Sequence, residues 1–250
     1  VREILIKENK VVGVSCYCGN EYKQFYASRG VVLAAGSFAA NPDLIQKISP
    51  KLKGLTTNNA PGSNGLAMLA AEKVGAKLVN LEFIQCLPGC PPGKKYRVRF
   101  HNDVSHFIFV NKNGERFIRE DRPRDEFRDA VLSLPEKYGF IIIDDEGFRR
   151  AGIVVQKEAV KAIEGGEAWK GETLEELAGK MGVPADNLIR TVEDYNEGVR
   201  LGKDRLGKKI HSLTLPIAHP PFWACYAGMT VHYTEGGIAI DETARVLNKK

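Results

Sequence analysis

The feature that most constrains the fold is a continuous apolar run, Gly30 to Gly36, which reads GVVLAAG. It shows neither the alternation of a half-buried strand nor the spacing of an amphipathic helix, and such runs are typical of strands buried in a parallel sheet. Three β-branched or alternating runs precede it, at 3–7, 11–18 and 21–27, and together predict a β-meander. Taken alone, the run is a buried strand with a turn after it, which favours an α/β fold.

The composition is that of a globular chain and argues against two classes of protein. With 250 residues, of which 43% are hydrophobic, the chain can form one large domain or two smaller ones. No apolar run approaches the roughly 20 residues of a membrane span. The net charge of +5 is modest and mixed with acidic residues, so we expect a small anionic molecule as partner and no nucleic acid.

The five cysteines bear on compartment and on metal binding. An odd number of cysteines in a chain too long to need disulfides favours a reducing compartment, so we expect a cytoplasmic protein. Export stays open, because the chain begins inside a strand pattern. The cysteine pairs lack the second half of a zinc site, and we expect no metal.

Two helices are expected after the apolar run. The first covers Ser37 to Ile48, and the second begins near Leu66, with Ser63 or Asn64 as its N-cap and Gly75 at its end. A helix N-terminus behind glycines can bind an anion, although most only begin a helix. Further strands are predicted at 79–88 and 139–144, and further helices at 158–164, at 173–181 with a capping box from Thr173 and Glu176, and from Pro184 onward.

A strand, a tight turn and a second short strand are predicted around Asn111 to Gly114, between the apolar run 107–110 and Arg116 to Ile118. Charged residues then dominate 119–127. By itself, such a run is typical of a solvated helix face.

The motif N-x-x-G-x-R-F at 111–117, followed by Arg124-Asp125, resembles the FAD-dependent flavoprotein subunits of the fumarate reductase and succinate dehydrogenase family. The stretch V-V-L-A-A-G-S-F-x-x-N-P at 31–42 and the stretch H-Y-T-E-G-G-I-A-I-D at 232–241 carry the same resemblance. It implies that Arg124 is the proton donor or acceptor at the substrate. The alternative for Arg124 is a structural ion pair with Asp121 or Asp125.

The resemblance also implies FAD as cofactor and assigns residues to it. The cofactor-binding residues that it implies are Gly36, Ser37, Ser63, Asn64, Gly65, Gly236 and Gly237. For the substrate it implies His232 or Tyr233, within a segment that includes Thr234, and which of His232 and Tyr233 makes the contact stays open. The family's G-x-G-x-x-G pyrophosphate loop is not in these 250 residues. We therefore expect an internal fragment of the parent protein, inactive by itself.

Three positions depart from the family pattern. Leu87 stands where fumarate-reducing members place a substrate-binding His, and Phe100 and Asp103 stand where they place a Glu and an Arg that relay protons. These changes argue against fumarate and for a larger or less symmetric enoate, because Leu cannot hydrogen-bond a carboxylate. Nearby polar residues offer a different anion site or relay, or equally the polar face of a strand: Arg97, Arg99, His101, Asp103 and His106.

The expected architecture is α/β plus α+β, with part of a Rossmann-like FAD-binding domain at 1–82 and 228–250 and an inserted α+β capping domain at 83–227. The expected function is hydride transfer between flavin and an activated C=C bond, with an anionic or enoate substrate and an electron-donor protein left open as partner. The alternatives are a ketosteroid dehydrogenase-like flavoprotein, in which Tyr233 would outweigh Arg124, and a catalytically inert cap or anion-binding fragment.

Overall fold

The computed structural model describes residues 1–249, and the chain divides into two compact units that are treated separately. Unit 1 combines Val1–Gln85 with the segment from Val231 onward, and unit 2 is Cys86–Thr230. Helices and strands occur in both units, which confirms the mixed α/β class. None of the helices within residues 1–249 has the length and apolarity needed to cross a lipid bilayer.

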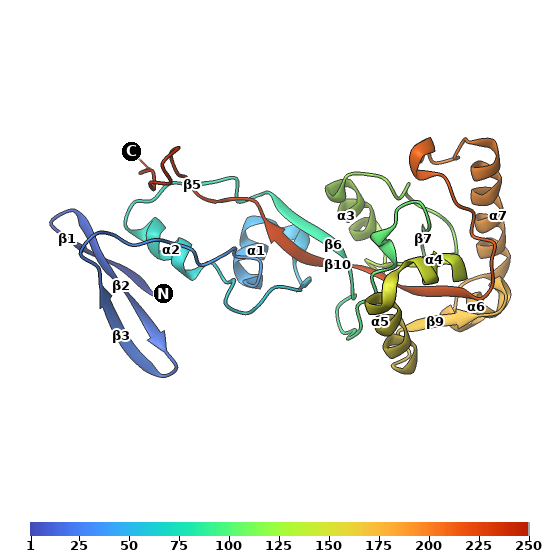
Figure 1. Ribbon diagram of the computed structural model, residues 1–250, viewed down its shortest axis with the longest axis horizontal. Helices are drawn as coiled ribbons and strands as arrows, with labels where there is room; N and C mark the ends of the chain where they lie inside the picture. The colour runs from blue at the N-terminus through green and yellow to red at the C-terminus, as the bar shows by residue number, and fades with distance from the viewer. Residues whose placement is uncertain (250) are drawn as a thin grey trace. The chain divides into compact units, whose positions relative to one another are not determined.

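The predicted meander is present in unit 1. It consists of β1 (Glu3–Lys7), β2 (Lys10–Cys18) and β3 (Glu21–Tyr26), three antiparallel strands in the order β1-β2-β3 (Figure 1). Ile4 on β1 is buried against Ala70, Ala71 and Ala76, so this sheet packs one face on the helix that follows.

The strand predicted from Gly30 to Gly36 is not formed. Within the described residues no strand pairs with this run, and the Val32 side chain is 90% exposed. A strand is stable only where a neighbour satisfies its backbone groups. The apolar sequence alone therefore did not decide the conformation.

The helices of unit 1 are shorter than predicted. The first, α1 (Pro42–Ile48), begins at Pro42 because proline fits the first helical turn and Asn41 caps it, accepting from Leu44 N at 3.0 Å. A 3₁₀ turn (Pro50–Leu52) and β4 (Thr56–Thr57) follow. The N-cap of α2 (Leu66–Lys73) is Gly65, not Ser63 or Asn64.

The strand predicted at 79–88 is divided in two. Asn80 has a left-handed backbone with φ of 57°, which separates β5 (Leu78–Val79) from β6 (Ile84–Gly89). In unit 1, β5 pairs with β11 (Gly237–Ile238), where Gly237 lies opposite Val79.

Unit 2 is built on antiparallel strands. The long strand β10 (Phe222–Thr234) pairs with β8 (Gly139–Ile143) and β9 (Ala168–Gly171), and β8 pairs with β7 (Ile108–Val110). All five residues of β8 are buried, as its apolar sequence predicts. The segment predicted at 116–118 forms only an isolated bridge between Arg116 and Val110.

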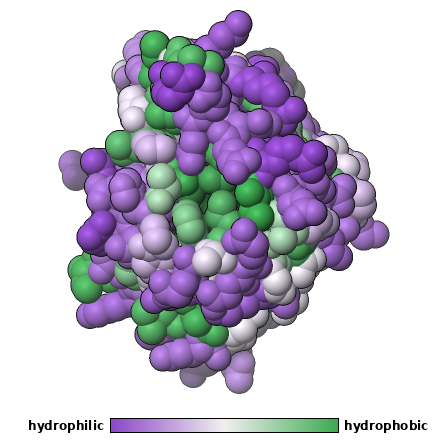
Figure 2. Space-filling model, turned by 90° about the vertical axis from the view of Figure 1, so that its right-hand side faces the viewer, coloured by the Kyte–Doolittle hydropathy of each residue, from purple (hydrophilic) through white to green (hydrophobic). Residues whose placement is uncertain are grey.

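Helices cover this sheet and complete the core of unit 2 (Figure 1). They are α3 (Arg124–Ser133), α4 (Asp145–Arg150), α5 (Gly152–Glu164), α6 (Leu174–Met181) and α7 (Ala185–Leu201), with 3₁₀ turns at Phe100–Asn102 and Ile210–Ser212. The capping box of α6 is confirmed, since Glu176 N donates to Thr173 Oγ1 and Glu172 N donates to the Glu176 carboxylate. On the face that carries α7, hydrophilic side chains surround a small apolar area (Figure 2).

Candidate active site

Arg124 is the first residue of α3, and its side chain is exposed. A cation at a helix N-terminus opposes the helix dipole, and the acidic residues Asp125 and Glu126 in the first turn offset that effect. Three residues further on, Phe127 is buried and stacks on Phe109, with ring centroids 4.1 Å apart. The helix start that carries Arg124 is therefore fixed on β7.

A buried ion network lies immediately before α3. Glu120 accepts a hydrogen bond from Phe109 N at 3.1 Å and pairs with Arg116 at 2.8 Å. Asp204 pairs with Arg116 at 2.6 Å, and Lys208 Nζ lies 3.3 Å from Glu120. Burial lowers the pKa of Lys208 below its usual value, although Glu120 opposes the effect. Because Glu120 and Phe127 both contact Phe109, the segment before Arg124 and the helix after it share one anchor.

The same segment is tied to the loop at 204–209 by two further contacts. Arg119 Nη1 donates to Gly207 O at 2.6 Å, and Lys209 N donates to Asp121 Oδ2 at 2.9 Å. Asp121, one of the two expected ion-pair partners of Arg124, is thus engaged with Lys209 and lies 3.5 Å from Arg119 Nε.

Three arginines of unit 2, here called the cationic cluster, lie close enough to His101 to act on its charge. Burial, followed by the charges of Arg97, Arg99 and Arg124, lowers the pKa of His101 to about 3. The imidazole is therefore neutral at pH 7, and its buried Nδ1 atom has no hydrogen-bond partner among the described residues. Three arginines that act on one neutral imidazole favour binding of an anion.

The arginines of this cluster differ in how they are neutralised. Arg99 makes a bidentate pair with Glu158 of α5, at 2.7–3.1 Å. Arg97 donates to the backbone oxygen of Pro88 at 3.3 Å, and burial together with the charge of Arg99 lowers its pKa.

Asp103 and His106, the other two candidates near this point, serve structural roles. Asp103 accepts from the backbone and hydroxyl of Ser105, which closes a local turn. His106 Nε2 lies 2.8 Å from Asp144 Oδ1, and both side chains are buried. These contacts favour a structural role for both residues over the relay that their sequence also allowed.

The candidate cofactor residues all lie in unit 1, and two loops of that unit bring five of them together. Ala40 N donates to Ser63 O at 2.9 Å, and Asn41 Nδ2 donates to Asn64 O at 2.9 Å. A Cβ on Gly36, whose φ is 76°, would lie 3.5 Å from Ser63 Oγ. Ser37 uses its hydroxyl to accept from Ala39 N. Small side chains on an exposed, left-handed turn are compatible with close approach of a dinucleotide.

At two of the candidate positions, Gly65 and Gly236, close packing alone requires a residue without a side chain. Gly65 has φ of 72°, and a Cβ there would lie 2.6 Å from Phe38 Cβ. A Cβ on Gly236 would lie 2.1 Å from Asn80 O. By contrast, a Cβ on Gly237 would meet nothing within 4 Å, so its backbone faces open space.

The substrate candidates at 232–234 lie at the end of β10, in unit 1. The Nδ1 atom of His232 lies 3.0 Å from the Asn58 side chain, and Asn59 Nδ2 donates to His232 O at 2.8 Å. Tyr233 is 51% exposed, whereas Thr234 is buried and its hydroxyl has no hydrogen-bond partner among residues 1–249. Asn58 and Asn59 were not among the predicted site residues, and their local sequence gives no signal for this contact.

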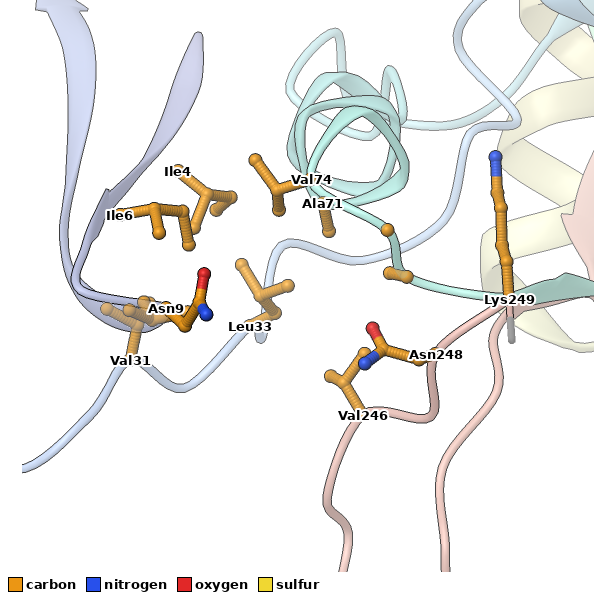
Figure 3. Close-up of a pocket in the computed structure, with 13 residues that line it drawn as sticks. Ile4, Ile6, Asn9, Val31, Leu33, Ala71, Val74, Val246, Asn248 and Lys249 are labelled. Carbon is orange, nitrogen blue, oxygen red and sulfur yellow. The ribbon is translucent and has the colours of Figure 1, made fainter.

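A cavity of about 710 Å³ lies elsewhere in unit 1 (Figure 3). Apolar side chains from β1, from the apolar run and from α2 point into it, among them Ile4, Ile6, Val31, Leu33 and Val74, with Asn248 and Lys249 at its edge. None of the predicted site residues lines it.

With this geometry described, comparison with known proteins identifies the family. The match to the family described as "FAD binding domain" extends over residues 1–250. The chain belongs to this family. FAD as the cofactor and the resemblance to fumarate reductase flavoproteins are thereby confirmed.

Two relatives and one solved structure show what this FAD-binding domain is similar to. It is 30% identical over 250 residues to a probable fumarate reductase of Shewanella frigidimarina, which covers 99% of this chain and 41% of the relative. It is 33% identical over 255 residues to an NADH:acrylate oxidoreductase of Vibrio harveyi, which covers 99% of this chain and 25% of the relative. The open conformation of a flavocytochrome c3 fumarate reductase matches with a TM-score of 0.78 at 29% identity, over 100% of this chain and 43% of that one. The chain thus spans less than half the length of these proteins.

Proposed function

We propose that the protein reduces the C=C bond of an α,β-unsaturated carboxylate, with FAD as hydride source and Arg124 as proton donor. The observation that carries this proposal is the cationic cluster of Arg97, Arg99 and Arg124 around the neutral His101. Such a cluster suits a carboxylate better than a neutral steroid, which disfavours the ketosteroid dehydrogenase alternative. The relatives named for fumarate and acrylate support the same substrate class.

Reduction of an enoate adds a hydride to one carbon and a proton to its neighbour. When bound and reduced, FAD would supply the hydride and become oxidised. Arg124 supplies the proton: its N–H bond breaks as a C–H bond forms at the carbon beside the carboxylate. An arginine is charged throughout the neutral range, so before it gives up the proton it also stabilises negative charge that develops on the substrate. Because the side chain is exposed, water can return the proton afterwards.

Unit 1 supplies the residues that would hold FAD. We assign this role to Gly36 and Ser37 in one loop and to Ser63 and Asn64 in the other, together with Gly237, whose backbone faces open space. We also assign Gly65 and Gly236 to FAD binding. Their role is indirect, because they set the backbone conformation of the loops that would hold FAD. In this view residues 1–82 and 228–250 form the FAD-binding part and 83–227 form the capping domain.

Within unit 1, the unpartnered hydroxyl of Thr234 favours a hydrogen bond to a ligand. His232 and Tyr233 remain candidates for the same contact. The substitutions at Leu87 and Phe100, both apolar, support an enoate other than fumarate.

The test uses the whole protein, with its FAD reduced by dithionite in the absence of air. Absorbance between about 350 and 500 nm should show a flavin, and acrylate or a larger enoate such as urocanate should reoxidise it faster than fumarate does. Arg124→Ala should keep the flavin spectrum and slow reoxidation by about 10²–10⁴-fold, the usual contribution of a positioned acid. The matched control is Arg122→Ala, which removes an exposed arginine of the same segment that pairs with Glu126.

Three results would contradict the proposal. They are a protein without flavin absorbance, an Arg124→Ala variant that is reoxidised at the normal rate, and a loss of rate in Tyr233→Phe alone. The last result would favour the ketosteroid dehydrogenase alternative.

The electron donor and the compartment complete the proposal. We assign electron delivery to a donor protein, and we place the protein in the cytoplasm because its cysteines are free within the described residues. Reduction of the bound flavin by cell extract, tested with and without its protein fraction, would check the first assignment.

A further inference from the structure

In the segment from Arg97 to His101, three polar residues alternate with two buried apolar residues. Val98 and Phe100 are buried, with 4% of each side chain exposed, whereas Arg97, Arg99 and His101 alternate with them and are half-buried. The buried pair anchors the segment, because Phe100 packs edge-on against Phe148 of α4 and the sulfur of Cys225 reaches the backbone of Val98. The charges of Arg97 and Arg99 act on the His101 ring, so the three polar side chains lie near one another.

The charges on this edge do not cancel. Glu158 neutralises Arg99 through a bidentate pair. Arg97 has a backbone carbonyl as its hydrogen-bond acceptor and no carboxylate partner within residues 1–249. A half-buried guanidinium without a carboxylate is costly, and a bound anion would remove that cost.

His101 adds an independent observation. Its Nδ1 atom is buried without a partner, an arrangement that native structures avoid unless a ligand or water completes it. The neutral ring carries one N–H group, which can donate to a carboxylate oxygen.

We propose that Arg97 and His101 form a subsite that binds the substrate's carboxylate, while Arg124 delivers the proton to the carbon beside it. The proposal rests on the function proposed above and names the two side chains that would bind the carboxylate of its substrate.

The first test is binding of a saturated carboxylate that cannot react. Propionate is titrated into the wild-type holoenzyme while the His101 ring is followed by NMR, with propionamide as the uncharged analogue. A carboxylate held beside the imidazole favours its charged form and should raise the pKa of His101 from its low value, which Arg97, Arg99 and Arg124 now depress. Propionamide should leave it unchanged. An unchanged His101 signal at saturating propionate, or an equal response to both ligands, would overturn the proposal.

The second test is kinetic and compares acrylate with acrylamide as oxidants of the reduced flavin. Arg97→Gln should raise KM for acrylate at least tenfold and leave acrylamide unaffected, and His101→Asn should change KM more than kcat. Arg150→Gln is the matched control, because Arg150 is an exposed arginine of unit 2 that pairs with Glu146. If Arg124→Ala abolishes turnover while Arg97→Gln leaves KM for acrylate unchanged, the subsite is wrong and the proposed function stands. If no enoate reoxidises the flavin, the proposed function fails, and the propionate titration still decides whether the subsite binds carboxylates.

Discussion

Replacing Glu120 by alanine should destabilise unit 2 by about 4 kcal/mol. Glu120 is buried and neutralises both Arg116 and Lys208, at 2.8 and 3.3 Å. Without Glu120, Asp204 is the one carboxylate that remains in this network for the two buried cations Arg116 and Lys208. Phe109 N also loses its hydrogen-bond acceptor. Breaking a buried ion pair costs about 3–5 kcal/mol and leaving a buried N–H unsatisfied costs about 1–3 kcal/mol. Because the two effects overlap, we expect about 4 kcal/mol.

The assay is urea unfolding of the holoenzyme followed by tryptophan fluorescence. Trp169 and Trp223, the two tryptophans of these 250 residues, lie in unit 2, so the change in their signal between wild type and variant reports on the part that contains the network. With a denaturant slope of about 2 kcal/mol per molar, the midpoint should fall by about 2 M.

The chain offers a matched control at the pair Arg122–Glu126. It has the same residue types and the same i,i+4 spacing, at 2.6 Å, but its side chains are 42% and 46% exposed. Glu126→Ala should cost less than about 1 kcal/mol, as exposed pairs usually do. Equal midpoint shifts in the two variants would refute the idea that burial makes the Glu120 network strong.

Two further predictions concern acid stability and a glycine. Burial would raise the pKa of Asp144, but hydrogen bonds from His106 and from three backbone N–H groups hold it well below its usual range. The stabilising effect of the Asp144 carboxylate is therefore complete above about pH 4 and is lost as pH falls through the folded-state pKa. Asp144→Asn should be much less stable than wild type at pH 6, and the difference should shrink toward pH 2. Urea unfolding at a series of pH values measures this difference. A difference that does not depend on pH would contradict this account. Gly65→Ala should lower the melting temperature by several degrees, because φ is 72° and a methyl group would lie 2.6 Å from Phe38 Cβ, whereas Gly179→Ala, with nothing within 4 Å, should not.

Local signals predicted a large part of the fold. Short-range patterns were enough for four features, since alternation, apolar runs and cap residues each involve only a few neighbouring positions. These features are the meander, β8, the capping box of α6 and the long helix α7. The apolar run Gly30 to Gly36 failed as a strand because pairing depends on neighbours, which no local pattern encodes. Pro42 was visible in the sequence and should have moved the start of α1 to that residue.

The site was predicted less completely for the same reason. Arg97, Arg99 and His101 were recognised as a polar pattern, but their significance depends on which charges are neutralised. Glu158, which neutralises Arg99, lies 59 positions away, and nothing in the local sequence links the two. His106 was equally prominent in sequence, and its buried partner Asp144 gives it a structural role.

The buried ion network before Arg124 also affects how the protein responds to rising temperature. Hydration of charged groups becomes less favourable as temperature rises, so the cost of keeping Arg116, Glu120, Asp204 and Lys208 out of water falls on warming, while hydrophobic stabilisation levels off. The segment that holds Arg124 should therefore unfold late on heating, after the exposed meander of unit 1 has unfolded. A protein held in this way would keep Arg124, the proton donor that we propose, in place up to temperatures at which the meander has begun to open.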